Sequence, residues 1–266
     1  MNTYKPAPDV QTITSNFPIP GFGYVPINAF VIKGAEPVLV DTGAMIEGAQ
    51  FMAALRSVID PAELKWIWLT HPDADHTGCL HRLLAENPRL RVVTSFLGVG
   101  IMSLSAPLPL DRVHLVNPGE ALVLADRKLT AFKPPAFDNP STTGFFDSRS
   151  RILYSSDCFG ALLANPPQDA AELSAKALRE GQILWTTIDS PWLHKADRGV
   201  LMKELDAIRR MEPAMILSSH LPAAGAKLID RLLATLADVP SAAPFIGPNQ
   251  AALEHMLEEM TEGQPS

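Results

Sequence analysis

Four side chains that commonly bind metal ions fall within six consecutive positions, namely His71, Asp73, Asp75 and His76. Pro72 disfavours a helical conformation of the residue before it, so we interpret this stretch as a loop that leaves an apolar strand at 66–70. Alternate residues of an extended loop point to the same side, which lets these side chains converge. The competing interpretation is a solvated turn, with Asp75 or Thr77 as the N-cap of the next helix. Two aspartates and two histidines together favour a metal site.

Further ligands would have to come from other loops, and two later apolar runs end in suitable residues. The run at 151–157 ends in Asp157, and the run at 214–220 ends in His220. Taken singly, Asp157 is typical of a turn and His220 of a hydrogen-bonded core histidine. Together with the loop at 71–76, they indicate ligands gathered at strand ends, where α/β layers place their chemistry.

Composition limits the class of protein. The chain has 266 residues, 47% of them hydrophobic, which is enough for one large domain with a buried core. Its net charge is −7 without a basic stripe, so we expect no nucleic-acid partner. The proline-broken N-terminus lacks the apolar core of a signal peptide and no run has membrane length, which predicts a cytoplasmic protein without membrane contact. The two cysteines, Cys79 and Cys158, exclude a disulfide framework, a four-cysteine iron site and a zinc ribbon.

Hydrophobic patterning predicts a mixed α/β fold. Apolar stretches around the turn signal Lys33-Gly34 predict a hairpin over 24–40. Helical spacing predicts helices at about 46–57, 79–88, 170–181, 198–210, 223–236 and 248–261. Strands are expected at 66–70, 90–98 and 214–220, with several short ones between 113 and 154. We expect a single domain, 1–266, in which two sheets lie between outer helices, with a C-terminal helical extension at about 240–266.

The order of the motifs resembles the metallo-β-lactamase superfamily over roughly 24–225. The motifs are "DTG" at 41–43, "THPDADHTG" at 70–78, "FDNPST" at 137–142, "SSD" at 155–157 and "SSH" at 218–220. The resemblance implies a four-layer αββα sandwich with metal ligands at His71, Asp75, His76, Asp157 and His220. This sequence departs from the family pattern at two positions, because Asp73 stands where the second histidine is usual and Asp138 stands where a third histidine is usual.

An aspartate at position 73 makes the chain resemble the flavodiiron and oxygen-binding diiron branch, which has a carboxylate there, and "LYSSDCFG" at 153–160 also resembles that branch. The resemblance implies two metal ions, one held by His71, Asp73 and Asp138 and the other by Asp75, His76 and His220, with Asp157 as the bridge. Such a carboxylate-rich set suits iron, with manganese or zinc as alternatives. The resemblance also implies that Asp41 lies beneath the metal loop and orients it.

Two functions remain open for a centre of this kind. The first is a diiron protein that binds or reduces dioxygen or a similar small oxidant; because the sequence contains no flavodoxin-like region, electrons would come from a separate reductase, or the protein would be a sensor. The second is a hydrolase of an ester, lactone, amide or phosphoester, in which a metal-activated water attacks and Asp75 serves as proton acceptor or ligand. A third interpretation is a binding protein with a vestigial site. We also expect a homodimer, only because homodimers are the most common assemblies of soluble proteins.

The "DTG" turn is also typical of aspartic proteases. Such an enzyme needs two matching turns, and the nearest second candidate, at 187–191, has proline in place of the glycine. This interpretation leaves the loop at 71–76 unexplained, and we set it aside.

Overall fold

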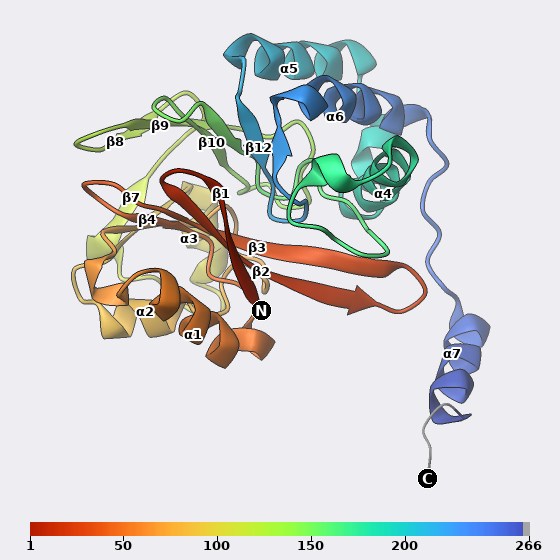
Figure 1. Ribbon diagram of the computed structural model, residues 1–266, viewed down its shortest axis with the longest axis horizontal. Coiled ribbons are helices and arrows are strands. Elements are labelled where there is room, and N and C mark those ends of the chain that lie inside the picture. Colours follow the sequence, from red (N-terminus) through yellow and green to blue (C-terminus); the bar gives the residue numbers. More distant parts are fainter. Residues whose placement is uncertain (263–266) are drawn as a thin grey trace.

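Two β-sheets lie face to face between two groups of helices in the computed structural model of the protein, which describes residues 1–262 (Figure 1). The end of the expected C-terminal extension, 263–266, lies outside the described residues. Helices α1 to α3 cover one sheet and helices α4 to α6 cover the other. The helices are α1 (Gly48–Val58), α2 (Leu80–Glu86), α3 (Phe96–Met102), α4 (Ala175–Asp189), α5 (Arg198–Met211), α6 (Ala226–Asp238) and α7 (Gln250–Glu262).

The first sheet carries seven strands in sequence order. They are β1 (Asn2–Ala7), β2 (Val10–Ile19), β3 (Gly23–Ile32), β4 (Val38–Val40), β5 (Trp66–Trp68), β6 (Arg91–Thr94) and β7 (Val113–Leu115). Strands β4 to β7 pair in parallel, so their carboxyl ends share one edge of the sheet. Asp41 follows β4 and the 69–78 loop follows β5, and both therefore reach that edge.

The second sheet has six strands in the order β13-β12-β11-β10-β9-β8. They are β8 (Ala121–Val123), β9 (Lys128–Phe132), β10 (Gly144–Asp147), β11 (Ile152–Tyr154), β12 (Met215–Leu217) and β13 (Ala224–Gly225). Strands β11 and β12 are parallel neighbours, with Tyr154 opposite Leu217. Asp157 and His220 each lie three residues beyond that pair, so the pairing delivers both to the same edge.

Three buried clusters separate the layers, and side-chain alternation along the strands explains them. In β5, Ile67 faces the cluster beneath α1 and α2, whereas Trp66 and Trp68 face the cluster between the sheets. A strand buried on both faces needs an unbroken apolar run, which "WIW" supplies. The third cluster lies between the second sheet and α4 to α6. The expected αββα layering is confirmed.

The structure corrects several expected element boundaries. The N-terminal strands β1 and β2 were not expected, because prolines interrupt that segment; Pro6 is tolerated since β1 is an edge strand. The strand expected over 90–98 ends at Thr94, where the Ser95 side chain accepts a hydrogen bond from the Gly98 amide and begins α3. The helix expected over 170–181 is a short 3₁₀ turn followed by α4, which continues to Asp189.

The C-terminal helix α7 stands to the side of the layers, at the end of an extended segment (Figure 1). The rings of Phe22 and Phe245 meet edge to face at 5.6 Å and attach that segment to the β2–β3 turn. Within the part of the chain that the structure describes, none of the helices has both the length and the apolar character needed to cross a lipid bilayer.

Candidate metal centre

Asp41 anchors the loop that follows β5. Its carboxylate is buried and accepts hydrogen bonds from the Thr70 amide at 2.9 Å, the Thr70 hydroxyl at 2.8 Å and His76 Nδ1 at 2.8 Å. The backbone of Asp41 is left-handed, with φ 56°. An aspartate tolerates this conformation better than most residues do, and such strain is common at functional sites. The loop is therefore positioned by a side chain from the neighbouring strand.

Backbone contacts hold the same loop against the "DTG" turn. The Thr42 amide donates to the His76 carbonyl at 2.7 Å, and the Gly78 amide donates to the Gly43 carbonyl at 2.8 Å. A Cβ at position 78 would lie 2.3 Å from the Met45 amide nitrogen, so only glycine fits there. The backbones of the two loops therefore approach each other closely at Gly78.

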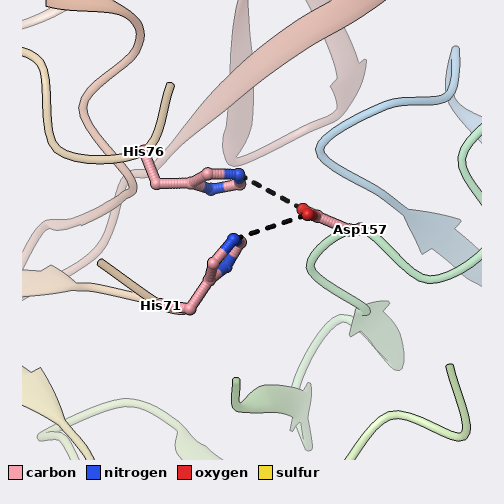
Figure 2. A group of neighbouring side chains, drawn as sticks. All are labelled: His71, His76 and Asp157. Atoms are coloured by element: carbon pink, nitrogen blue, oxygen red, sulfur yellow. Dashed lines mark ion pairs between the residues drawn. The ribbon is translucent and has the colours of Figure 1, made fainter. Parts of the chain in front are cut away.

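Asp157 lies among three imidazoles, and Figure 2 shows it facing His71 and His76. One carboxylate oxygen, Oδ1, is 3.2 Å from His76 Nε2 and 3.3 Å from His220 Nε2. The other oxygen, Oδ2, is 3.4 Å from His71 Nε2. The two oxygens of one carboxylate thus face different groups of ligands, which is the arrangement that a bridging carboxylate requires.

Two clusters of possible ligands flank Asp157. In the first, His71 Nε2 is 3.8 Å from Asp73 Oδ2 and 3.7 Å from Asp138 Oδ1. In the second, Asp75 Oδ2 is 3.5 Å from His76 Nε2 and 3.4 Å from His220 Nε2. The structure therefore brings together all seven residues expected as ligands: His71, Asp73, Asp75, His76, Asp138, Asp157 and His220.

Each histidine is oriented through its Nδ1 atom. His76 Nδ1 faces Asp41, His220 Nδ1 donates to the Pro26 carbonyl at 2.8 Å, and His71 Nδ1 lies 3.2 Å from the hydroxyls of both Thr70 and Ser156. These contacts turn the Nε2 atoms toward the carboxylates. Among the described residues, His71 Nε2 and His76 Nε2 are buried without a hydrogen-bond partner. A buried nitrogen of this kind is costly unless it has a ligand, so the residues fit a bound cation.

Asn28 on β3 links the two sheets beside His220. Its side-chain amide donates to the carbonyls of Ser218 at 3.0 Å and Leu221 at 2.8 Å, and its backbone amide donates to Ser219 at 2.9 Å. The His220 loop of the second sheet is thus fixed to a strand of the first.

The 137–142 loop carries Asp138 and is held by neighbouring polar groups. Lys133 Nζ donates to the Pro140 carbonyl at 2.9 Å and lies over the Phe137 ring, 3.7 Å from its centroid. Asn139 Nδ2 donates to Asp73 Oδ1 at 3.0 Å. This loop therefore places Asp138 next to Asp73 and fixes the orientation of the Asp73 carboxylate.

The charges of the cluster perturb one another. Burial, together with the nearby carboxylates of Asp157 and Asp73, raises the pKa of Asp138 to about 8. Burial opposes ionisation of Asp157 too, but the three imidazoles outweigh it and hold the pKa of Asp157 well below its usual range. Burial would lower the pKa of His220, yet Asp157 and Asp75 raise it to about 9. These shifts favour the neutral form of Asp138 and the protonated form of His220 near neutral pH.

A comparison with models of protein families identifies the family of the chain. The family model described as "ODP family beta lactamase" matches residues 25–220. The chain belongs to this family. ODP membership, together with the layered fold, confirms the predicted metallo-β-lactamase architecture and the resemblance to flavodiiron proteins.

Sequence relatives of this ODP family protein include two flavoproteins. The type A flavoprotein fprA of Rhodobacter capsulatus is 30% identical over 137 residues, which cover 50% of this chain and 32% of the relative. The flavo-diiron protein FprA2 of Clostridium acetobutylicum is 25% identical over 201 residues, which cover 73% of this chain and 48% of the relative. The chain thus spans about half, or less, of the length of these relatives.

Solved structures share the fold. Rubredoxin oxygen:oxidoreductase from Desulfovibrio gigas superposes with a TM-score of 0.80 at 18% identity, over 92% of this chain and 63% of that one. The flavodiiron protein from Giardia intestinalis superposes with a TM-score of 0.79 at 16% identity, over 90% and 59%.

One acidic residue near the centre was not expected from the sequence. A carboxylate oxygen of Asp189, the last residue of α4, lies within 4.8 Å of ligand atoms of Asp138 and Asp157. Burial and the charge of Asp157 raise the pKa of Asp189 to about 7. In the sequence, 187–191 resembles only an incomplete second protease turn. Because the predicted helix ends at 181, the sequence carries no sign that Asp189 lies at a helix end.

We expect the metal-free ODP family protein to lose stability as the pH rises from about 6 to about 9.5. The folded-state pKa values of Asp138 and His220 are raised above their unfolded values, so their contribution is present at low pH and is lost as the pH rises through about 8 and about 9. The loss should be on the order of 5 kcal/mol, because above pH 6 the shifts span about 2 pKa units for Asp138 and about 2.5 for His220 at about 1.4 kcal/mol each, reduced by the partial exposure of Asp138. Urea unfolding of chelator-treated protein at both pH values measures it. A free energy of unfolding that stays constant or rises between these pH values would contradict the raised pKa values of Asp138 and His220.

Replacing Asp41 with asparagine should weaken metal binding roughly 10- to 100-fold, because loss of the partner of a metal-bound histidine typically has that effect. Asparagine tolerates the left-handed backbone, but its amide group presents a donor to Thr70 and His76 where they need an acceptor. Competition with a chromophoric chelator measures the affinity. Wild-type affinity in a folded Asp41→Asn protein would show that Asp41 does not orient the site.

Proposed function

We propose that the protein holds two iron ions and uses them to bind or reduce dioxygen or a similar small oxidant. One ion would be held by His71, Asp73 and Asp138, and the other by Asp75, His76 and His220. Asp157 would join them through its two oxygens. The observation that carries this proposal is the position of the Asp157 carboxylate, with one oxygen toward His71 and the other toward His76 and His220.

The donor set supports iron. Three imidazoles and four carboxylates form an oxygen-rich set, which suits iron or manganese better than zinc, whose sites favour nitrogen and sulfur. The four negative charges also balance two divalent cations. We therefore infer that position 73 is an aspartate because its oxygen donor matches the metal.

The protein's own residues determine how a small molecule reaches the centre. The side chains of His71 and His76 are almost completely buried, whereas those of Asp73 and Asp75 are 42% and 32% exposed. The centre therefore opens on the side of these two aspartates, and an oxidant would approach from there. When bound, the iron pair would supply the electrons or the binding site for the oxidant. A separate reductase would replenish those electrons if the protein turns over.

A groove beside Asp75 favours a second candidate, a metal-dependent hydrolase. It has a volume of about 360 Å³ and an apolar lining that includes Phe17, Val25, Met45 and Ile46. Dioxygen does not need a groove of this size, whereas the apolar part of an ester or lactone would fit it. In this alternative, the metals would activate a water molecule and Asp75 would accept a proton at its carboxylate.

Metal analysis of protein purified anaerobically, without an affinity metal, tests the proposal. Elemental mass spectrometry should find two irons per chain, and the absorption spectrum should change when air is admitted. Zinc or manganese without a response to air would contradict the proposal and favour the hydrolase, to be followed by a panel of ester, lactone and phosphoester substrates.

A variant of position 73 gives a sharper comparison. Asp73→His exchanges an oxygen donor for nitrogen, so we expect its metal content to shift from iron toward zinc and its response to air to weaken. Growth with both metals and elemental analysis of wild type and variant in parallel measures the shift. Unaltered metal preference would refute our explanation of position 73.

A further inference from the structure

The end of helix α4 brings a carboxylate to the metal centre. Asp189 is the last residue of α4, and its carboxylate oxygen lies within 4.8 Å of ligand atoms of Asp138 and Asp157. Ser190 donates its hydroxyl to Asp189 Oδ2 at 2.8 Å, which orients the carboxylate. None of the seven proposed ligands comes from α4, so Asp189 is an addition to that set.

Helix α4 is attached to the centre one turn before Asp189. Trp185 Nε1 donates to the Asp157 carbonyl at 3.2 Å, and its ring lies 4.5 Å from that of His220. This approach depends on Gly160, where a Cβ would come within 2.5 Å of Trp185 Nε1. Residues four apart lie on the same face of a helix, so the contact that seats Trp185 also directs Asp189 toward the ligands.

Apart from the Ser190 hydroxyl, the end of α4 offers little that stabilises a negative charge at this position. The C-terminal end of a helix carries a partial negative charge, and the last turn of α4 has no basic residue. The neighbouring side chains Asp138 and Asp157 are carboxylates as well. A cation between these groups would remove the repulsion.

A buried nitrogen lies beside two of these carboxylates, Asp138 and Asp157. His71 is fully buried, and its Nε2 has no hydrogen-bond partner among the described residues, although Asp157 and Asp138 lie 3.4 Å and 3.7 Å away. This side of the centre has a single nitrogen donor, because Asp138 stands where the family pattern has a histidine. It therefore depends on carboxylates to hold its ion.

We propose that Asp189 is an eighth ligand of the centre, a carboxylate that helps to hold the ion on the Asp138 side. This inference rests on the dinuclear site of the proposed function. With Asp189, five carboxylates face two cations, so two divalent ions leave one negative charge and a pair with one trivalent ion is neutral. The centre thus favours one ion in a higher oxidation state, and its His71 side favours a hard, oxygen-preferring metal.

Asp189→Asn tests the proposal, with Glu180→Gln on the exposed face of the same helix as the matched control. Isothermal titration calorimetry measures the affinity of chelator-treated protein for each ion. The titrants are Mn²⁺ and, under anaerobic conditions, Fe²⁺. We expect the ion on the Asp138 side, which has a single nitrogen donor, to be the weaker-held ion. Asp189→Asn should bind it about tenfold or more less tightly. The affinity for the other ion, and both affinities of the control variant, should be unchanged. The metal-free variant should unfold at a temperature no lower than wild type, because a repelling charge has been removed.

A second variant separates ligation from packing. Asp189→Glu keeps the carboxylate and should retain the weaker-held ion at close to wild-type affinity. Unchanged affinity for both ions in Asp189→Asn, or equal losses in Asp189→Asn and Asp189→Glu, would overturn the proposal. If wild type itself binds fewer than two ions, the proposed dinuclear site is wrong. This result is distinguishable from those that overturn only the role of Asp189.

Discussion

Replacing Asp157 with alanine is expected to weaken the binding of both metal ions severely. Its carboxylate lies 3.2 to 3.4 Å from the Nε2 atoms of all three site histidines. No other carboxylate in the described chain is this close to all three. The affinity should fall by more than about 100-fold for each ion. Removing a residue that only hydrogen-bonds to a metal ligand already lowers metal affinity about 10- to 100-fold, and Asp157 is itself a proposed ligand. Titration of the chelator-treated variant with Fe²⁺ or Mn²⁺ measures the loss.

The matched control is Asp111→Asn, which changes an exposed aspartate on the surface. It should bind both ions like wild type. Retention of one tightly held ion in Asp157→Ala would show that Asp157 serves one metal position only, and the bridging role would then be wrong.

The largest expected effect on stability comes from a buried cation elsewhere in the fold. Arg127 precedes β9, and its guanidinium donates to Asp147 at 2.8 Å and to Asp9 at 2.6 Å. The side chains of Arg127 and Asp147 are 1% and 0% exposed. Arg127→Leu would leave Asp147 as an uncompensated buried charge, which typically costs about 3–5 kcal/mol. Equilibrium unfolding in urea measures the change in the free energy of unfolding.

Two further variants make this measurement specific. Arg149→Leu removes an exposed arginine that pairs with Asp126, and it should cost less than about 1 kcal/mol because water screens the pair. The double variant Arg127→Leu with Asp147→Leu removes both buried charges and should recover part of the loss. A cost below about 1 kcal/mol for Arg127→Leu alone would contradict the assignment of Asp147 as a charge that depends on Arg127.

The positions of the proposed ligands were predictable from the sequence because their signals are local. An apolar run followed by His71 or Asp157 identifies both a strand and its end, and parallel pairing then gathers such ends at one edge. The signal for Asp138 is weaker, since only the motif "FDNPST" around it indicates its position, and the structure brings it within 3.7 Å of His71 Nε2.

Asp189 could not be found in this way. Its distance from Asp157 depends on how α4 packs, and near Asp189 this packing includes the close approach of Trp185 to Gly160. Neither residue carries a signal of its own in the sequence. The edge strand β1 escaped prediction for a related reason, since prolines argue against a strand in general but are tolerated in one at the sheet edge.

The attachment of the His220 loop to Asn28 has a mechanical consequence. The loop at 69–78 extends from the first sheet, whereas Asp157 and His220 extend from the second, so a metal pair would act as a clasp across the sandwich. The Trp68 and Phe145 rings, 4.4 Å apart, pack between the same two sheets and hold them together. Changes in the surface loops would then alter which molecules enter, while the residues that would hold the metals stay in place.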